Sequence, residues 1–414
     1  MRKHVRQDYR RVADRLAAGL VDAWGPPDKS EGFVRVWDLR AEDILNSFID
    51  LPTYQGQLCS LAVSYDGDWI ATGYNFFAGV WPVAAGPNAI ELVVLDWFRD
   101  WIGYPEGAGG LFTSGGSAAS LDALVAARDA AGYPERPTVY MSDQSHTALE
   151  RAARIVGVRR EHVRKIKSDA HFRLDMDALA EALARDREAG LGPIAVCANG
   201  GATNTGAVDP LPELADYCAA EGLWLHVDAA YGGFAVLTER GRTLLRGLDR
   251  ADSITLDPHK WLFQPFEIGC VLVREGRRLP ETFAVHPEYL EDRDLGLGEI
   301  DFLDHGIQLT RSFRALKLWL SVQVFGMDAF RAAVEQGLDA ARRTEELLSA
   351  AGIWEIVTPA HLGVVTFRHR DFPAGVPGAD AFHRRLTEAV RRDGYAFFSS
   401  TRLEGRTVLR LCTI

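Results

Sequence analysis

The sequence predicts an α/β protein, in which a large and mostly parallel sheet domain is followed by a smaller α+β domain. From about residue 88 to about residue 274, short apolar segments alternate with amphipathic segments of helical length. This alternation is typical of a parallel sheet that helices cover on both faces. After about residue 310, a long helical segment precedes further strands and one more helix. We therefore expect an N-terminal segment over 1–75, a large domain over 76–305 and a small domain over 306–414.

The individual elements follow from the hydrophobic period and from the glycines that end helices. Helices are predicted over 88–103, in the second half of 110–132, and over 146–157, 176–190, 211–222 and 380–394. Strands are predicted over 138–143, 194–201, 223–230, 253–257, 267–274, 364–370, 396–400 and 407–414. The segment 311–352 is predicted to be a long helix that is interrupted near Gly326.

The N-terminal segment holds a predicted amphipathic helix over 5–24, which ends at Gly25-Pro26-Pro27. Its apolar stripe includes Tyr9, Val12, Leu16 and Leu20. A stripe at a chain terminus has little of its own subunit to pack on, so we expect it to pack on a partner subunit in a homodimer.

Residues 33–66 are harder to interpret. The segments 33–39 and 58–65 are predicted strands, and Asp66-Gly67 is a predicted turn. The segment VRVWDL resembles the end of a propeller blade, but the sequence contains no second copy. A single blade would bury little surface, so a propeller is not expected.

Composition excludes several classes of protein. The chain has 414 residues, of which 47% are hydrophobic and 25% charged, as in ordinary globular proteins. There is no run of about 18 apolar residues, so no membrane span is expected, and no apolar stretch follows the basic N-terminus as it would in a signal peptide. A net charge of −11 argues against nucleic-acid binding.

The cysteines form no CxxC pair, and most of them lie in apolar segments. We interpret them as buried free thiols of a cytoplasmic protein, and they are Cys59, Cys197, Cys218, Cys270 and Cys412. The sequence shows no HExxH motif and no cluster of His and Cys, so no metal site is expected.

The first candidate functional residue is Lys260, in the segment DPHKW between two predicted strands. In α/β sheets, ligands bind at the carboxyl ends of the strands, which is where this lysine is expected. A lysine amine in a partly apolar pocket loses its proton and attacks carbonyl carbons. Taken alone, Lys260 is better explained as a solvated surface charge, and only its neighbours favour a functional role.

Three further signals also fall at strand ends. Asp228 ends a buried strand, where it either caps the next helix or pairs with a cation such as the ring nitrogen of a pyridine cofactor. The turn 114–118, SGGSA, precedes a helix, and it is either an ordinary loop or a phosphate cradle. His146 is either a helix cap or a ring that stacks on a flat ligand. Together with Lys260, these are the parts needed to hold pyridoxal phosphate.

Six segments carry a resemblance to a known family: TSGGSAASL, SDQSH, NGGATNTGAVDP, HVDAAYGG, DPHKW and RSFRALKLW. In their order and rough spacing, the sequence resembles the group II pyridoxal-phosphate-dependent decarboxylases, which act on aromatic amino acids, histidine or glutamate. The resemblance is clear over about residues 76–345. It implies fold type I of the pyridoxal-phosphate-dependent transferases, the fold of aspartate aminotransferase, and a homodimer with pyridoxal 5'-phosphate as cofactor.

The resemblance also implies roles for single residues. Lys260 matches the Schiff-base lysine, Asp228 the carboxylate on the pyridine nitrogen, and His146 the histidine stacked on the ring. The full set of expected cofactor-binding residues is Gly116, Ser117, His146, Thr203, Asp228, Ala230 and Lys260. His259 matches the histidine beside the lysine, and it is an expected catalytic residue.

Two further matches concern the reaction and the substrate. Tyr289 resembles the tyrosine of a mobile loop that protonates the substrate's Cα, a position where members that deaminate oxidatively resemble phenylalanine. Trp81 matches an aromatic residue at the dimer interface, so we expect it in the substrate pocket. The family's substrate-side loop, with its His-Pro or aromatic-Pro stretch, has no clear equivalent in 33–66.

The expected function is therefore decarboxylation of an L-amino acid, most simply an aromatic one, to the amine and CO₂. Two alternatives stay open at this point. One is another reaction on the same fold and cofactor, such as oxidative deamination with aldehyde formation, and the other is an inactive relative. The unplaced segment 33–66 leaves the substrate's side chain open.

Overall fold

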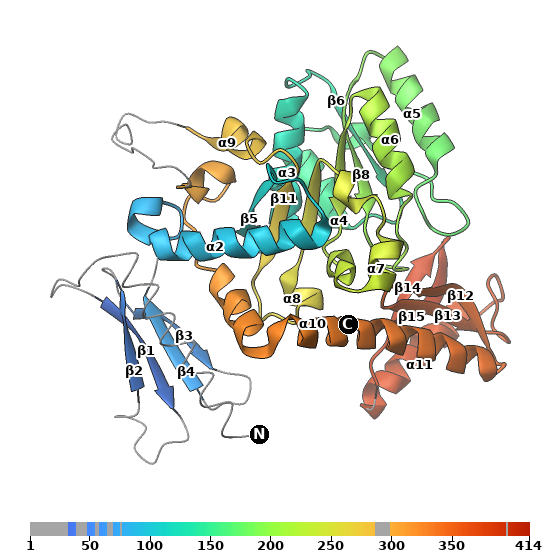
Figure 1. Ribbon diagram of the computed structural model, residues 1–414. Coiled ribbons are helices and arrows are strands. Elements are labelled where there is room, and N and C mark those ends of the chain that lie inside the picture. Colours follow the sequence, from blue (N-terminus) through green and yellow to red (C-terminus); the bar gives the residue numbers. More distant parts are fainter. Residues whose placement is uncertain are drawn as a thin grey trace. The chain divides into compact units, whose positions relative to one another are not determined.

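The computed structural model in Figure 1 describes residues 77–285, 299–394 and 396–414, and before them the backbone of four strands. These strands are β1 (Gly32–Asp38), β2 (Phe48–Thr53), β3 (Leu58–Val63) and β4 (Trp69–Tyr74). The expected helix over 5–24 and the expected turn at Asp66-Gly67 lie outside the described residues.

The chain divides into two compact units. The first comprises Met1–Val94 and Phe283–Gly326, and the second comprises Leu95–Thr282 and Met327–Ile414. The expected division at residues 75 and 305 is a different partition and stays a prediction.

Strands β1–β4 of the first unit form one antiparallel sheet in the order β2-β1-β4-β3. The strands expected over 33–39 and 58–65 correspond to β1 and β3, whereas β2 and β4 were not predicted. A four-stranded antiparallel sheet is the unit of a propeller blade. A propeller repeats this unit around an axis, and a single sheet of this kind does not make one.

The second unit is built on a seven-stranded sheet in the order β5-β11-β10-β9-β8-β6-β7. Strands β10, β9, β8, β6 and β7 pair in parallel, and β11 runs antiparallel to both of its neighbours. The bounds are β5 (Gly109–Thr113), β6 (Pro137–Ser142), β7 (Val163–Ile166), β8 (Gly192–Asn199), β9 (Trp224–Asp228), β10 (Ser253–Leu256) and β11 (Gly269–Val273).

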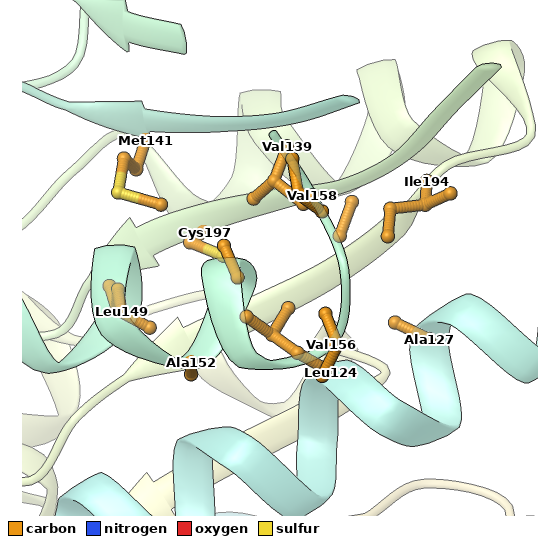
Figure 2. Packing of buried hydrophobic residues seen from close by; sticks show 12 residues of the cluster. Leu124, Ala127, Val139, Met141, Leu149, Ala152, Val156, Val158, Ile194 and Cys197 are labelled. Atoms are coloured by element: carbon orange, nitrogen blue, oxygen red, sulfur yellow. The ribbon is translucent and has the colours of Figure 1, made fainter. Parts of the chain in front are cut away.

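Helices cover both faces of this sheet. The helices of the second unit are α3 (Gly116–Ala130), α4 (Thr147–Ile155), α5 (Met176–Glu188), α6 (Leu211–Glu221), α7 (Glu239–Leu244) and α8 (Pro258–Trp261). Two further helices pass from one unit to the other, namely α2 (Trp81–Ile102), which enters the second unit at Leu95, and α9 (Arg278–Phe283), which leaves it after Thr282. Figure 2 shows Val139 and Met141 of β6 packed among side chains of α3 and α4. Tyr140, between them in the strand, donates a hydrogen bond to Asp186 of α5 on the opposite face, with 2.9 Å between the oxygens. Successive side chains of β6 therefore point to opposite faces of the sheet, with α3 and α4 on one face and α5 on the other.

The C-terminal part of the second unit is a smaller α+β region. Its four-stranded antiparallel sheet has the order β12-β13-β15-β14. The elements are the part of α10 (Ala315–Ala350) that follows Gly326, and β12 (Trp354–His361), β13 (Val364–His369), α11 (Ala379–Asp393), β14 (Ser399–Leu403) and β15 (Arg406–Cys412). The predicted interruption of the long helix is confirmed, because Gly326 breaks α10 with a φ of 75°. The predicted fold class, a mostly parallel sheet domain plus a small α+β domain, is confirmed as well.

Two further findings concern sequence-based expectations. Within the described part of the chain, no helix has both the length and the apolar character that a membrane crossing requires. Cys197, Cys218 and Cys270 are buried free thiols, and Cys412 is a half-buried one. The side chain of Cys59 lies outside the described residues.

Candidate active site

A cavity of about 310 Å³ lies at the carboxyl ends of β6, β8, β9 and β10, in the second compact unit. This volume falls at the lower end of the range of about 300–1,000 Å³ that small-molecule sites occupy. Parallel strands bring their carboxyl ends to one edge of a sheet, so the loops that follow these strands meet there. The cavity gathers the expected residues Gly116, Ser117, His146, Thr203, Asp228, Ala230, His259 and Lys260.

The glycine turn between β5 and α3 forms one wall of the cavity. No side chain caps the start of α3, so its first backbone N–H groups are available to an anion. A Cβ on Gly116 would lie 3.1 Å from Asp257 Oδ2 and 3.2 Å from Ala230 Cβ. A Cβ on Gly269 would lie 2.4 Å from the Cα of Gly115. A side chain at Gly269 would therefore clash with the turn, and Gly116 packs tightly against its neighbours. The turn can also let an anion approach the helix N-terminus.

His146 combines the two alternatives that its sequence position left open. Its Nδ1 accepts a hydrogen bond from the amide of Ala148 at 3.2 Å, so the ring caps α4. The same ring lines the cavity.

Asp228 ends β9, and its Oδ1 accepts a hydrogen bond from the amide of Ala230 at 3.1 Å. The carboxylate is half-buried and lines the cavity. Two residues earlier in the strand, His226 is fully buried, with its Nδ1 2.8 Å from Ser253 Oγ and its Nε2 3.3 Å from Thr255 Oγ1. Burial lowers the pKa of His226 to about 4, so this imidazole is neutral beneath the cavity.

Lys260 lies in the short helix α8, which follows β10. Its Nζ is 3.0 Å from Oδ2 of Asp257, whose side chain is only 5% exposed. His259 places Nδ1 2.6 Å from the carbonyl oxygen of Ile268, which fixes the ring, and its Nε2 lies 3.6 Å from the same Asp257 oxygen. The lysine amine therefore enters the cavity beside a buried carboxylate.

The lining residues that sequence reasoning missed include Asn199, Tyr231 and Asp257. Asn199 ends β8 and Asp257 follows β10 at the same sheet edge, so the strand-end rule that selected Asp228 was sufficient to find them. Asn199 donates from Nδ2 to Asp209 Oδ2 at 2.9 Å, and burial raises the pKa of Asp209 to about 6. Burial also raises the pKa of Tyr231.

Two expected site residues are not placed at the cavity. Tyr289 lies outside the described residues. Trp81 belongs to the first compact unit, where its amide donates a hydrogen bond to Asp301 Oδ1 at 2.6 Å. The roles expected for both residues stay predictions.

The residues present fit pyridoxal phosphate. The glycine turn and the uncapped start of α3 suit its phosphate, and Lys260 suits its aldehyde carbon. The carboxylate of Asp228 suits a protonated ring nitrogen, since a half-buried anion gains from a cationic partner. Asp257 also lines the cavity, and its Oδ1 is buried without a hydrogen-bond partner among the described residues. This oxygen can accept a hydrogen bond from a polar ligand.

The sequence is similar to known proteins over most of its length. Residues 54–370 match the family model described as the pyridoxal-dependent decarboxylase conserved domain. The chain is 45% identical over 353 residues to aromatic-L-amino-acid decarboxylase of Bacillus atrophaeus, covering 84% of this chain and 73% of that protein. It is 33% identical over 370 residues to phenylacetaldehyde synthase of Arabidopsis thaliana, covering 86% of this chain and 75% of that protein.

The fold is similar to solved structures of the same kind. The crystal structure of Oryza sativa TDC with PLP and tryptamine matches with a TM-score of 0.77 and 33% identity, covering 81% of this chain and 74% of that one. Rhodiola rosea 4-hydroxyphenylacetaldehyde synthase matches with a TM-score of 0.74 and 29% identity, covering 81% of this chain and 72% of that one. The comparison of sequences and the comparison of structures therefore both match this chain to decarboxylases and aldehyde synthases.

Proposed function

Because the chain belongs to the pyridoxal-dependent decarboxylase family, and is a pyridoxal-phosphate-dependent amino acid decarboxylase, we propose that its substrate is an aromatic L-amino acid. The observation that carries this proposal is the 45% identity to the aromatic-L-amino-acid decarboxylase of Bacillus atrophaeus, across 84% of the chain. The products are then the aromatic amine and CO₂.

When bound, pyridoxal phosphate supplies an aldehyde carbon and an electron-accepting ring. In our proposal, the backbone N–H groups of Gly116 and Ser117 bind the phosphate, helped by the positive end of the α3 dipole. Lys260 Nζ would hold the aldehyde carbon. Asp228 keeps a proton on the ring nitrogen, which its fixed carboxylate favours at the end of β9.

The remaining cavity residues position these groups. The ring of His146 is held by its cap to α4, which lets it lie flat against a bound ring. Ala230 is small enough to let a ring approach β9, and Thr203, in the loop that follows β8, also lines the cavity. His259 is fixed by its contact with the Ile268 carbonyl, which leaves Nε2 to exchange a proton with the bound substrate or with Lys260.

We assign to Tyr289 the delivery of a proton to the substrate's Cα after CO₂ has left. The support is its place in the segment HPEYL, which resembles the family's mobile loop. A positioned general acid accelerates such a step by roughly 10²–10⁴-fold. By the same resemblance, Trp81 contributes to the substrate pocket.

A homodimer and a cytoplasmic location are also part of the proposal. The dimer is supported by the apolar stripe of residues 5–24, which needs a surface to cover it. The location is supported by the buried free thiols Cys197, Cys218 and Cys270, because such thiols are typical of reducing compartments.

A second candidate function is aldehyde formation on the same cofactor. The observation that favours it is similarity to two aldehyde synthases, one 33% identical in sequence and one with a TM-score of 0.74. The residue that separates the two functions in our proposal is Tyr289. A phenol that reaches Cα directs the reaction to the amine, whereas phenylalanine leaves Cα open to O₂.

The decisive experiment measures CO₂, amine, ammonia and H₂O₂ from a panel of aromatic, acidic and imidazole amino acids, under air and under nitrogen. We expect amine and CO₂ from an aromatic substrate, with little ammonia, in both atmospheres. Ammonia and H₂O₂ under air would establish aldehyde formation instead. Products from acidic amino acids alone would refute the aromatic assignment, and the absence of any product would identify an inactive relative.

The variant Tyr289→Phe tests the proton donor in the same assay. It should lose most amine formation and, under air, gain aldehyde and ammonia. If it makes amine at nearly the wild-type rate, Tyr289 is not the donor.

A further inference from the structure

We propose that the C-terminal sheet holds part of the cofactor site in place. Its residues Arg410 and Thr401 are positioning residues, because they hold the turn 200–207 by hydrogen bonds. This turn follows β8 and carries Thr203 into the cavity. The inference rests on the proposed function, because it assumes that Thr203 faces bound pyridoxal phosphate. All of the residues concerned belong to the second compact unit.

The first support is the alternation of side chains along β15. Leu409 and Leu411 pack in an apolar cluster with Val365, Phe367 and the helices α10 and α11. Strand geometry then directs positions 408, 410 and 412 to the other face of the sheet. On that face, Val408 packs in a separate cluster that contains Ala207 of the turn. The C-terminal sheet thus has one face for its own helices and one face for the turn.

The second support is the pair of polar contacts that this face makes. Arg410 Nε donates a hydrogen bond to the carbonyl oxygen of Thr203 at 2.8 Å. Thr401 Oγ1, on the neighbouring strand β14, donates to Asn204 Oδ1 at 2.8 Å. An arginine within an otherwise apolar strand sequence, VLRLC, is explained by this contact, because its guanidinium fixes the backbone of the residue that enters the cavity.

The third support is the close approach of the turn to the sheet. Gly206 has a φ of 72°, and a Cβ there would lie 2.2 Å from the carbonyl oxygen of His361. A Cβ on Gly201 would lie 2.8 Å from Leu362 Cδ1. The turn is therefore held against the end of β12 and the start of β13 with no room for a side chain. On the same side, Cys412 Sγ lies 3.2 Å from the hydroxyl of Tyr231, another cavity-lining residue.

Through these contacts, the C-terminal sheet influences the affinity of the site for pyridoxal phosphate. Thr203 is exposed in the cavity, so its position depends on how firmly its backbone is held. Without the Arg410 and Thr401 hydrogen bonds, the turn samples positions in which Thr203 no longer meets the cofactor. Binding then costs more conformational entropy, and affinity falls.

The test measures the dissociation constant of pyridoxal phosphate for Arg410→Gln and for Thr401→Val, by quenching of tryptophan fluorescence in the full-length protein. Each variant should bind about three- to tenfold more weakly, which is the range that one net hydrogen bond gives. Arg410→Lys keeps a charge and a donor, so it should recover part of the affinity.

The chain offers matched controls for both substitutions. Arg402, on β14, donates to Gly405 within its own hairpin, and Thr387, on α11, donates to the carbonyl of His383. Arg402→Gln and Thr387→Val should bind the cofactor with wild-type affinity. Melting temperatures of the cofactor-free proteins identify any general loss of stability. Such a loss alone would not weaken cofactor binding in Arg410→Gln and Thr401→Val while leaving it unchanged in the two controls.

The outcomes separate this inference from the proposed function. If the wild type binds pyridoxal phosphate, and Arg410→Gln and Thr401→Val bind it as their controls do, the positioning role is refuted. If variants and controls weaken equally, the sheet acts only through stability, and the inference also fails. If the wild type does not bind the cofactor at all, the proposed function itself is wrong.

Discussion

The buried imidazole of His226 makes the stability of the sheet domain depend on pH. Its pKa is lowered from 6.5 to about 4 by burial, and its hydrogen-bond partners Ser253 and Thr255 are neutral. In the unfolded chain the same imidazole takes up a proton near pH 6.5. The folded state resists that proton, so the unfolded state binds more protons between about pH 4 and pH 6.5, and stability falls as the pH falls through this window.

The size of the effect follows from the two pKa values. With 6.5 unfolded and about 4 folded, lowering the pH from 7 to 5 costs the folded state about 2 kcal/mol through this one group. The assay is urea unfolding of the cofactor-free protein at both pH values, for wild type and for His226→Asn. Asparagine places a polar atom near the Nδ1 position but does not titrate. Its packing cost is present at both pH values and cancels in the difference.

We expect the wild type to lose about 2 kcal/mol more than His226→Asn between pH 7 and pH 5. Equal losses for wild type and His226→Asn would show that the buried imidazole is protonated in the folded state, and the reasoning would be refuted.

The other predictions concern the site and the assembly. Borohydride reduction of the holoenzyme should fix a pyridoxyl group on the peptide that contains Lys260, as mass spectrometry would show, and a label on another peptide would overturn the assignment. Asp228→Asn should keep the fold and much of the bound cofactor but lose roughly 10²–10³-fold in turnover, as other electrostatic catalytic groups do, and a rate within about threefold of wild type would contradict its role. Light scattering should give the mass of a dimer, and an active monomer would exclude an interface role for residues 5–24.

The assembly of the cavity was predictable from the sequence. The alternation of apolar segments and helices indicated parallel strands, and the carboxyl ends of such strands meet at one edge. Asp228 and Lys260 are 32 residues apart in the sequence, yet Asp228 ends β9, Lys260 follows the adjacent strand β10, and both line the same cavity. Four weak local signals became one site because topology, rather than sequence distance, brings them together.

The strands that were missed lie mainly at edges. β7 ends the seven-stranded sheet and β12 ends the C-terminal sheet. Most of their residues are only partly buried, as in the VRKI segment of β7, so hydrophobic alternation is weak. An edge strand keeps one row of backbone groups and much of its surface in contact with water, and its composition therefore approaches that of a loop.

Arg410 shows a different limit of sequence-based prediction. The pattern VLRLC predicts that residue 410 faces away from the two leucines, but it does not identify what the arginine meets. Its partner, the carbonyl of Thr203, is 207 residues away in the sequence and is a backbone atom, which no residue type reveals. Local patterns indicate which groups face the cavity, whereas the contacts that hold those groups in place are long-range. Thr203 was expected at the site only because of the family resemblance, and that resemblance did not identify the strand that fixes it. We therefore expect cofactor affinity to depend on residues of β14 and β15 that no local pattern indicated.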